Sequence, residues 1–542
     1  MFTLLLVGVL GVSQMGALSF PVTGNAVCKK KFNDGMLALH SFMYDRAHGE
    51  FQAAVKGDPR CAMAHWGDAM AHNHPLWGEE DVAAGRATLA AVGSEEGLTV
   101  KEKAYLASAR ALFGEGDPKS RLKAWLGAAE RMHADFPGDD EVALEHALAL
   151  IGNAERLSDV RKLMQAAAIG LDVFARKPTH PGAAHYVIHA CDSPEHAILA
   201  LPAAERYAKI APAASHALHM PTHIFVQLGM WDRVARSNEV AWAASQKEER
   251  GRSIDKLDWH AYSWLAAAYL ELGQLKRAEG LLHELGERLA REDNSDPRFA
   301  YSLIAHLLVT DAGAWDRVDE IVKPIASHLP LEKGEDAGSL GCAQHAPGGT
   351  LGTRYPVGLI SQLRVRDLRA EAAMRRGDEA GVRAELETEK PIYQAMETWN
   401  KMFSPQYYDR RKNLESVFLL GARAYKERSE AAWGKAGDAI KKVIEAADPF
   451  ASGPSFDPPP EQWLGELELA AGKPKEALAA FDAALLRHPR LSRSLLGAAR
   501  AAKAANEPEI ARARYGELAK LWTDADAELP ALAEARAGQR AP

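Results

Sequence analysis

Small and aromatic residues recur along this chain at an interval of 34 residues, which restricts its fold more than any other feature. Ala477 and Phe481 return 34 positions later as Ala511 and Tyr515. Near the N-terminus the same kinds of residue occur in the same order: Gly35, Ala47, Phe51, Ala54 and Pro59. Small side chains let two antiparallel helices approach, an aromatic ring fills the space between them, and proline ends the second helix. Because one such hairpin cannot bury its apolar face alone, the interval predicts a stack of helical hairpins.

The composition agrees with a folded, helical protein. Of the 542 residues, 47% are hydrophobic and 25% are charged, which is typical of soluble folded proteins. This length exceeds that of one ordinary globular core, so several domains or one extended repeat array is expected. The net charge is −8, and no basic stripe is concentrated in one segment. Nucleic acid is therefore not expected as a partner.

The hairpin near the C-terminus carries the repeat motif most completely. Its pattern is that of the tetratricopeptide repeat, a two-helix unit of 34 residues, and Glu468 departs from it. The matching positions are Leu464, Gly465, Gly472, Ala477, Phe481, Ala484 and Pro489. Four other segments resemble a group of exported bacterial tetratricopeptide proteins with His-rich motifs: LHSFMYDRA (39–47), CAMAHWGDAM (61–70), HPGAAHYVIHA (180–190) and HMPTHIF (219–225). The resemblance implies an all-α fold, a right-handed superhelical solenoid, and it implies no particular activity.

The first 19 residues have the pattern of an export signal. Residues 2–12 are mostly apolar, and Ala17, Leu18 and Ser19 form a small-x-small cleavage site. No Lys or Arg precedes the apolar run, which departs from the usual signal. The run is too short for a permanent membrane anchor. We therefore expect a periplasmic or secreted protein.

Two segments interrupt the helical pattern. Residues 329–357 are rich in Gly without a period and predict a long loop, whereas residues 448–460 are rich in Pro and predict a linker. The expected organisation has four parts. These are a signal peptide at 1–19, a main repeat array at 20–447 that contains the loop, the linker at 448–460, and a C-terminal pair of repeats with a tail at 461–542.

Four cysteines are present, an even number that is compatible with pairing in an exported protein. Cys28 and Cys61 lie just before successive predicted helical segments, so we expect a disulfide between them. The alternative is that all four cysteines are buried thiols. The pairing of Cys191 and Cys342 stays open.

Histidines are concentrated in residues 180–223, which hold seven of the 20 in the chain. His185 and His189 are four residues apart, as are His219 and His223, and the second pair follows the first by 34 residues. A spacing of four places both rings of a pair on one helix face. The offset of 34 places the two pairs at equivalent positions of neighbouring repeats, where both face one concave groove.

Further histidines fall at groove-facing positions when the repeat is aligned on Gly229 and Gly273. His216 and His260 then occupy the second position of their units, and His180 lies just ahead of its helix. The predicted metal ligands are therefore His180, His185, His189, His216, His219, His223 and His260. His40 and His74 fall at the edge of the groove and are interpreted as structural.

Imidazole ligands of this kind suit a transition metal, with copper favoured in an exported protein and zinc or iron as alternatives. No His-Glu-x-x-His motif is present, so a zinc protease is not indicated. The leading hypothesis is a metal-binding protein, with a copper-dependent oxidoreductase as its enzymatic form. Two alternatives remain: an interaction scaffold that binds a peptide, protein or small molecule in the groove, and histidines that serve core packing. Whether the protein is an enzyme is left undecided.

Overall fold

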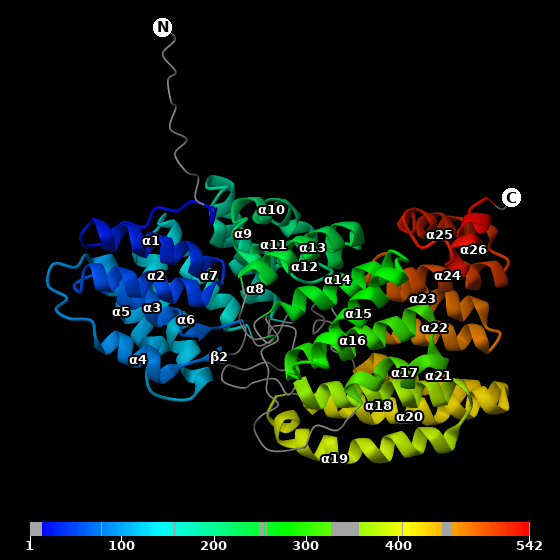
Figure 1. Cartoon of the computed structure of the whole chain (residues 1–542). Coiled ribbons are helices and arrows are strands. Elements are labelled where there is room, and N and C mark those ends of the chain that lie inside the picture. Colours follow the sequence, from blue (N-terminus) through cyan, green and yellow to red (C-terminus); the bar gives the residue numbers. More distant parts are fainter. Residues whose placement is uncertain are drawn as a thin grey trace, which may run out of the picture. The chain divides into compact units, whose positions relative to one another are not determined.

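A computed structural model describes residues 14–76, 79–154, 159–248, 254, 257–326, 357–403, 405–446 and 458–540. The described chain is built of helices, with one two-stranded ladder in which Asn73 pairs with Glu80 and His74 with Glu79 (Figure 1). It divides into two compact units. The first comprises Met1–Ala154, Asp159–Cys191 and Ile198–Ile224, and the second comprises the rest. None of the described helices combines the length and the apolar character needed to cross a membrane.

The first unit contains the N-terminal helices and the short ladder. Its elements are α1 (Ala26–His40), α2 (Tyr44–Gly57), α3 (Ala62–Met70), β1 (Asn73–His74), β2 (Glu79–Glu80), α4 (Val82–Ala90), α5 (Val100–Leu112), α6 (Pro118–Asp135), α7 (Asp140–Gly152), α8 (Val160–Arg176), α9 (Pro181–Ala190), most of α10 (Ala197–Ile210), α11 (Ser215–His219) and the start of α12 (Pro221–Gln227).

The second unit continues with helices alone. Its elements are α13 (Trp231–Glu248), α14 (Trp259–Glu271), α15 (Leu275–Leu289), α16 (Ser295–Ala312), η2 (Trp315–Arg317), α17 (Val318–Val322), η3 (Lys323–Ile325), α18 (Val357–Arg375), α19 (Glu379–Phe403), α20 (Pro405–Glu427), α21 (Glu430–Ala446), α22 (Pro460–Ala470), α23 (Pro474–Arg487), α24 (Ser492–Ala504), α25 (Pro508–Leu521) and α26 (Pro530–Gly538). Within each unit, helices that follow one another across a short turn pack together, such as α1 with α2 and α22 with α23.

The repeat motif has the packing role that its spacing predicts. Phe51 on α2 is fully buried, and a Cβ added to Gly35 or Gly67 would lie 2.6 or 2.4 Å from its ring. The ring is therefore held between the first helix of its own hairpin and the first helix of the next. Phe481 is held in the same way, at 2.9 Å from an added Cβ on Gly465 and 2.3 Å from one on Gly497. The fold is thus all-α, an array of tetratricopeptide-type hairpins.

Side chains at the helix starts supply partners for backbone N–H groups that have none within the helix. Asn25 accepts hydrogen bonds from the backbone N–H groups of Val27 and Cys28 at the start of α1. At the start of α5, Thr99 and Glu102 form a reciprocal capping box. Proline occupies the first helical position of α6, α9, α22, α23, α25 and α26, where its missing N–H costs nothing.

The segments expected to be irregular are described only in part. Residues 1–13 of the predicted signal, residues 327–356 with Cys342, and residues 447–457 of the predicted linker lie outside the described residues. Residues 14–19 pack on the first unit, where the Ala17 N–H donates to the Thr179 carbonyl at 3.2 Å and the Gln14 carbonyl accepts from the Ala213 N–H at 3.0 Å. Cleavage after Ser19 would remove these contacts.

The structure joins Cys28 and Cys61 by a disulfide, with their Cα atoms 5.9 Å apart. Cys28 is the third residue of α1 and Cys61 is the N-cap of α3, so the bond links the first helices of two neighbouring hairpins. Cys191 carries a buried thiol that is not part of a disulfide.

Candidate metal centre

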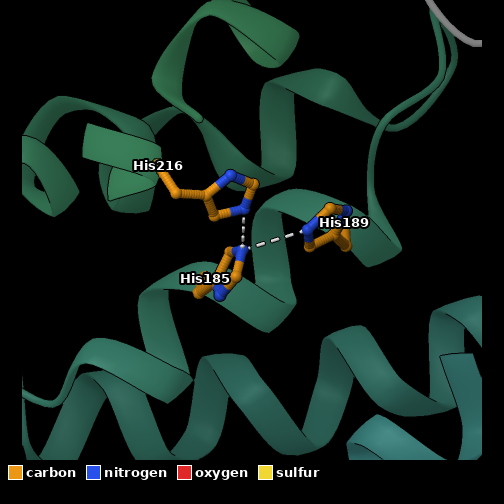
Figure 2. A group of neighbouring side chains, drawn as sticks. All are labelled: His185, His189 and His216. Carbon is orange, nitrogen blue, oxygen red and sulfur yellow. Dashed lines mark hydrogen bonds between the residues drawn. The ribbon is translucent and has the colours of Figure 1, made fainter. Parts of the chain in front are cut away.

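Three of the predicted ligands bring their Nε2 atoms together inside the first unit. His185 and His189 come from α9 and His216 comes from α11 (Figure 2). The Nε2 atom of His185 lies 3.0 Å from Nε2 of His189 and 3.1 Å from Nε2 of His216. The rings of His185 and His189 are fully buried. Buried nitrogens this close need a proton or a cation between them, because their lone pairs otherwise repel.

The proton of His185 is fixed on its other nitrogen. Nδ1 of His185 donates to the backbone carbonyl of His40 at 2.7 Å. His40 is the last residue of α1, where carbonyls lack a partner within the helix. A neutral imidazole carries one N–H, so Nε2 of His185 presents a lone pair to His189 and His216. That lone pair faces two nitrogens, so it either accepts their protons or shares a cation with them.

Burial keeps the rings of His185 and His216 neutral, which is the form that binds metals. The pKa of His185 lies well below its ordinary value, first because of burial and then because of the neighbouring His189 and His216. The pKa of His216 is also lowered well below its ordinary value by burial, and then by the surrounding histidines. Metals such as zinc bind imidazole nitrogen at about 2.0–2.1 Å, which places the nitrogens of a tetrahedral site roughly 3.4 Å apart. The observed separations are close to that value.

The second pair lies beside the first three rings. Nε2 of His219 is 3.1 Å from Nε2 of His223, and both side chains are buried. The ring centroids of His189 and His223 are 6.2 Å apart. His219 and His223 also contribute to the lowered pKa of His216. The structure therefore gathers both pairs of histidines around His216.

His180 lies outside this group of three rings, and both of its ring nitrogens form hydrogen bonds within the protein. As the N-cap of α9, its Nδ1 accepts from the Ala183 N–H at 3.3 Å. Its Nε2 donates to Oε1 of Glu141 at 2.9 Å. Both nitrogens of His180 thus have protein partners, and the structure does not bring this ring to the three nitrogens above. His260, the remaining predicted ligand, lies on α14 in the second unit, with its ring 4.9 Å from that of Trp264.

A buried hydrogen-bond network around Glu141 includes His40, whose backbone carbonyl accepts the hydrogen bond from Nδ1 of His185. Nε2 of His40 donates to Oε2 of Glu141 at 2.9 Å, and the Tyr186 hydroxyl donates to Nδ1 of His40 at 2.9 Å. Although burial opposes it, the hydrogen bonds from His180 and His40 hold the pKa of Glu141 well below its ordinary value. Burial lowers the pKa of His40, so its ring is neutral. Each of these hydrogen bonds then has a defined donor and a defined acceptor.

Sequence reasoning missed Glu141, Tyr186 and Phe42, and it interpreted His40 as structural. Phe42 adopts a left-handed backbone conformation with φ of 53°, which is unfavourable for a bulky residue. Its ring packs on those of His185 and His216, at centroid distances of 4.3 and 5.8 Å. Nothing in the local sequence marks Phe42 for this role, since His185 and His216 are more than 140 positions away.

A separate group is formed by His48, Asp68 and His72. Nδ1 of His48 lies 2.5 Å from Oδ1 of Asp68, and the ring centroids of the two histidines are 5.4 Å apart. Asp68 is buried, whereas His48 is exposed. This group of ligand-type side chains is nearer the surface than the centre around His185.

No protein-family model matches the chain, and no curated protein does. Solved structures of repeat proteins do align with it. Yeast Tom70 is 11% identical over 94% of this chain and 95% of its own, with a TM-score of 0.25. A monomeric mutant of IFIT1 with Gppp-AAAA is 11% identical over 94% of this chain and 90% of its own, with a TM-score of 0.33.

A signal-transduction ATPase with a tetratricopeptide repeat sensor from Pyrococcus horikoshii is 14% identical, over 93% of this chain and 72% of its own, with a TM-score of 0.32. TM-scores this low carry no argument about function. The partners and ligands of those proteins are therefore not transferred to this chain, and function must be argued from its own residues.

Proposed function

We propose that the first unit binds a transition-metal ion between His185, His189 and His216, with His219 and His223 available as further ligands. One observation carries this proposal: three Nε2 atoms converge while the proton of His185 is held on Nδ1 by the His40 carbonyl. A histidine placed for core packing alone would not need its partners' nitrogens at 3.0–3.1 Å. Metal-bound histidines characteristically donate their other N–H to a carbonyl or carboxylate, as His185 does.

Copper is the metal that we favour, with zinc or iron as the alternatives. Imidazole nitrogens suit all three, and divalent copper binds such ligands most tightly. Three protein nitrogens leave a fourth coordination position, which is the arrangement of catalytic rather than structural sites. A copper-dependent oxidoreductase is the enzymatic form of this proposal, and a metal-binding protein without turnover is its simpler form.

Export to the periplasm or the medium completes the proposal. The apolar N-terminal run and the Cys28–Cys61 disulfide support it, because disulfides persist in oxidising compartments. N-terminal sequencing of protein recovered from the periplasm tests the predicted cleavage after Ser19. A mature chain that begins upstream of Gln14 would instead keep the contacts that residues 14–19 make with the first unit.

The alternative function is an interaction scaffold. Stacked helical hairpins form extended surfaces that many repeat proteins use to bind peptides or other proteins. This function requires no metal and predicts that substitution of a buried histidine acts through stability alone. The two functions therefore differ in the effect of a single histidine on metal content.

Metal titration of matched variants separates the two. Wild type, His185→Ala and His283→Ala would be purified without a histidine tag and titrated with copper and with zinc by calorimetry. His283 is exposed in the second unit, so its variant removes an imidazole without touching the centre. We expect wild type and His283→Ala to bind alike and His185→Ala to bind at least about tenfold more weakly. Equal binding by all three, or none by wild type, would refute the metal proposal.

A further inference from the structure

Two pairs of polar side chains meet where α2 packs on α3 in the first unit. His48 and Gln52 lie on α2, whereas Asp68 lies on α3 and His72 lies in the turn that follows it. A spacing of four residues places two side chains on the same face of a helix. His48, Asp68 and His72 each bring one ring nitrogen or carboxylate oxygen to within 4.8 Å of the others. None of these residues is a proposed ligand of the centre around His185.

The Asp68 carboxylate is fully buried and has no permanent cation beside it. The Gln52 amide donates a hydrogen bond to its Oδ2. Among the described residues, no Lys or Arg pairs with either of its oxygens. A buried carboxylate is costly unless it is both hydrogen-bonded and paired with a positive charge. Asp68 therefore requires a cation, which is either a proton on His48 or a bound ion.

The second oxygen of Asp68 lies beside the histidines without a hydrogen bond. Nδ1 of His48 is 2.5 Å from Oδ1, but Oδ1 has no partner with hydrogen-bond geometry among the described residues. The ring centroids of His48 and His72 are 5.4 Å apart. Burial lowers the pKa of His72 although Asp68 opposes the shift, so this ring is neutral and offers a lone pair. A proton on His48 would serve Oδ1 alone, whereas a metal ion can be shared by Oδ1 and both rings.

We propose that His48, Asp68 and His72 form a second metal site, which binds a divalent transition-metal ion such as zinc. Two imidazoles and one carboxylate are an established ligand set for zinc and for ferrous iron, and they leave a position open to water. The hydrogen bond from Gln52 to Oδ2 orients the carboxylate and leaves Oδ1 for the ion.

The distances require only a small adjustment on binding. Zinc binds nitrogen and oxygen ligands at about 2.0–2.2 Å, which places the ligand atoms of a tetrahedral site roughly 3.4 Å apart. The contact between Nδ1 of His48 and Oδ1 of Asp68 is shorter than this and must widen. The side chain of His48 is 46% exposed, so its ring has room to turn.

Access to solvent distinguishes this site from the centre around His185. The rings of His185 and His189 are fully buried, whereas His48 lies at the surface. An ion held by His48 can therefore exchange with the medium, and its open position can receive a small ligand. Because the two sites share no ligand, this inference does not depend on the proposed function.

Equilibrium dialysis of the full-length protein against zinc tests the inference. His48→Ala and His283→Ala would each be made in wild type and in His185→Ala, all without a histidine tag. His283 is exposed in the second unit, so its variant removes one surface imidazole elsewhere. We expect His48→Ala to bind about one zinc ion fewer per chain than its parent in both backgrounds, and His283→Ala to match its parent. Zinc lost with His185→Ala but not with His48→Ala would overturn this inference and leave the first centre standing.

A second pair of variants tests the carboxylate. Asp68→Asn removes the charge and keeps an oxygen that can accept from Gln52, whereas Asp135→Asn makes the same change at an exposed residue of the first unit. We expect Asp68→Asn to lose the same zinc ion and Asp135→Asn to keep it. Should Asp68→Asn fail to fold, His48→Ala still decides. An ion pair between Asp68 and a protonated His48 needs no metal, so unchanged zinc binding in folded Asp68→Asn, or no zinc uptake by wild type, would overturn the inference.

Discussion

Three atoms of His40 each take part in a different hydrogen bond. Its carbonyl fixes the proton of His185, its Nε2 donates to Glu141, and its Nδ1 accepts from Tyr186. A Cβ added to Gly182 on α9 would lie 2.4 Å from Nδ1 of His40, so this ring occupies the space that any other side chain would fill. Gly182 is thus required by close approach rather than by its backbone conformation.

Gly182→Ala should therefore displace the His40 ring and loosen the carbonyl that orients His185. We expect a loss of roughly 1–3 kcal/mol in the free energy of unfolding, as for overpacked cores, together with weaker metal binding. The control is Gly280→Ala, which meets no atom within 4 Å on α15 and should stabilise by about 0.5–1 kcal/mol. Denaturant titration measures both. A Gly182→Ala protein as stable as wild type would show that the fit around His40 is looser than the structure indicates.

Glu145 should make the protein less stable as the pH rises. Its pKa is about 7 when folded, against an ordinary value of 4.5, so the folded state binds the proton more tightly. The stabilising effect of that proton is complete below pH 4.5 and is lost as the pH rises through 7. Above pH 7 the difference corresponds to about 3 kcal/mol. Glu145→Gln should therefore melt at a higher temperature than wild type at pH 8, with a smaller or no advantage at pH 4.5, and a gap independent of pH would contradict this account.

At the scale of elements, the sequence predicts the helical hairpins well and their side-chain contacts poorly. The spacing of Ala47 and Phe51 reflects contacts within one hairpin and with the next hairpin. These contacts could therefore be predicted from the sequence. The same holds for the pair on α9, which one helix face brings together. The role of Glu141 depends on the meeting of α1, α7 and α9, three helices far apart in sequence, and no local pattern encodes it.

The second histidine pair comes together as its spacing predicts, but its two residues lie on different helices. The spacing of four residues predicts that His219 and His223 lie on one face of a single helix. In the structure α11 ends at His219 and α12 begins at Pro221, because proline has no N–H to continue the ladder of hydrogen bonds. Among the described residues, His216 forms a close group with His185 and His189, and His219 and His223 lie close to each other.

The disulfide between Cys28 of α1 and Cys61 at the start of α3 gives a prediction at the scale of elements. Replacing Cys28 and Cys61 together by Ser should destabilise the first unit by about 3 kcal/mol, since the bond restricts a loop of 33 residues in the unfolded chain. Thermal denaturation with and without reductant measures the effect, which should be absent in the double variant. Peptide mapping of unreduced protein from its native compartment supplies the check, and two free thiols there would contradict the predicted bond.

At the scale of the whole molecule, the C-terminal hairpins are part of the second unit. The sequence separates residues 461–542 by a Pro-rich segment, yet their helices contact α14 and the turn after it. The Ser492 N–H donates to Glu271 at 2.6 Å, the Trp522 indole donates to the Glu271 carbonyl at 3.0 Å, and the Asp526 N–H donates to the Gly273 carbonyl at 3.0 Å. These contacts join segments more than 220 residues apart, which no repeat spacing reveals.

A chain that ends at Ala446 should lose stability in the second unit and keep its metal. The truncation leaves α14 without the partners of Glu271, while the five clustered histidines all belong to the first unit. Neighbouring contacts dominate in repeat proteins, so the loss should stay within the second unit. Calorimetric scanning should show one transition lowered and one unchanged, with metal content per chain equal to that of wild type. Loss of metal from a truncated protein whose first transition is intact would count against this separation.

The central claim is that a metal ion lies between the Nε2 atoms of His185, His189 and His216. Anomalous diffraction from copper-loaded crystals, recorded above and below the copper absorption edge, locates the ion directly. We expect a peak about 2.0–2.1 Å from each of the three nitrogens, as for imidazole ligands generally. A peak elsewhere in the chain, or none among these three rings in crystals that contain stoichiometric copper, would contradict the claim.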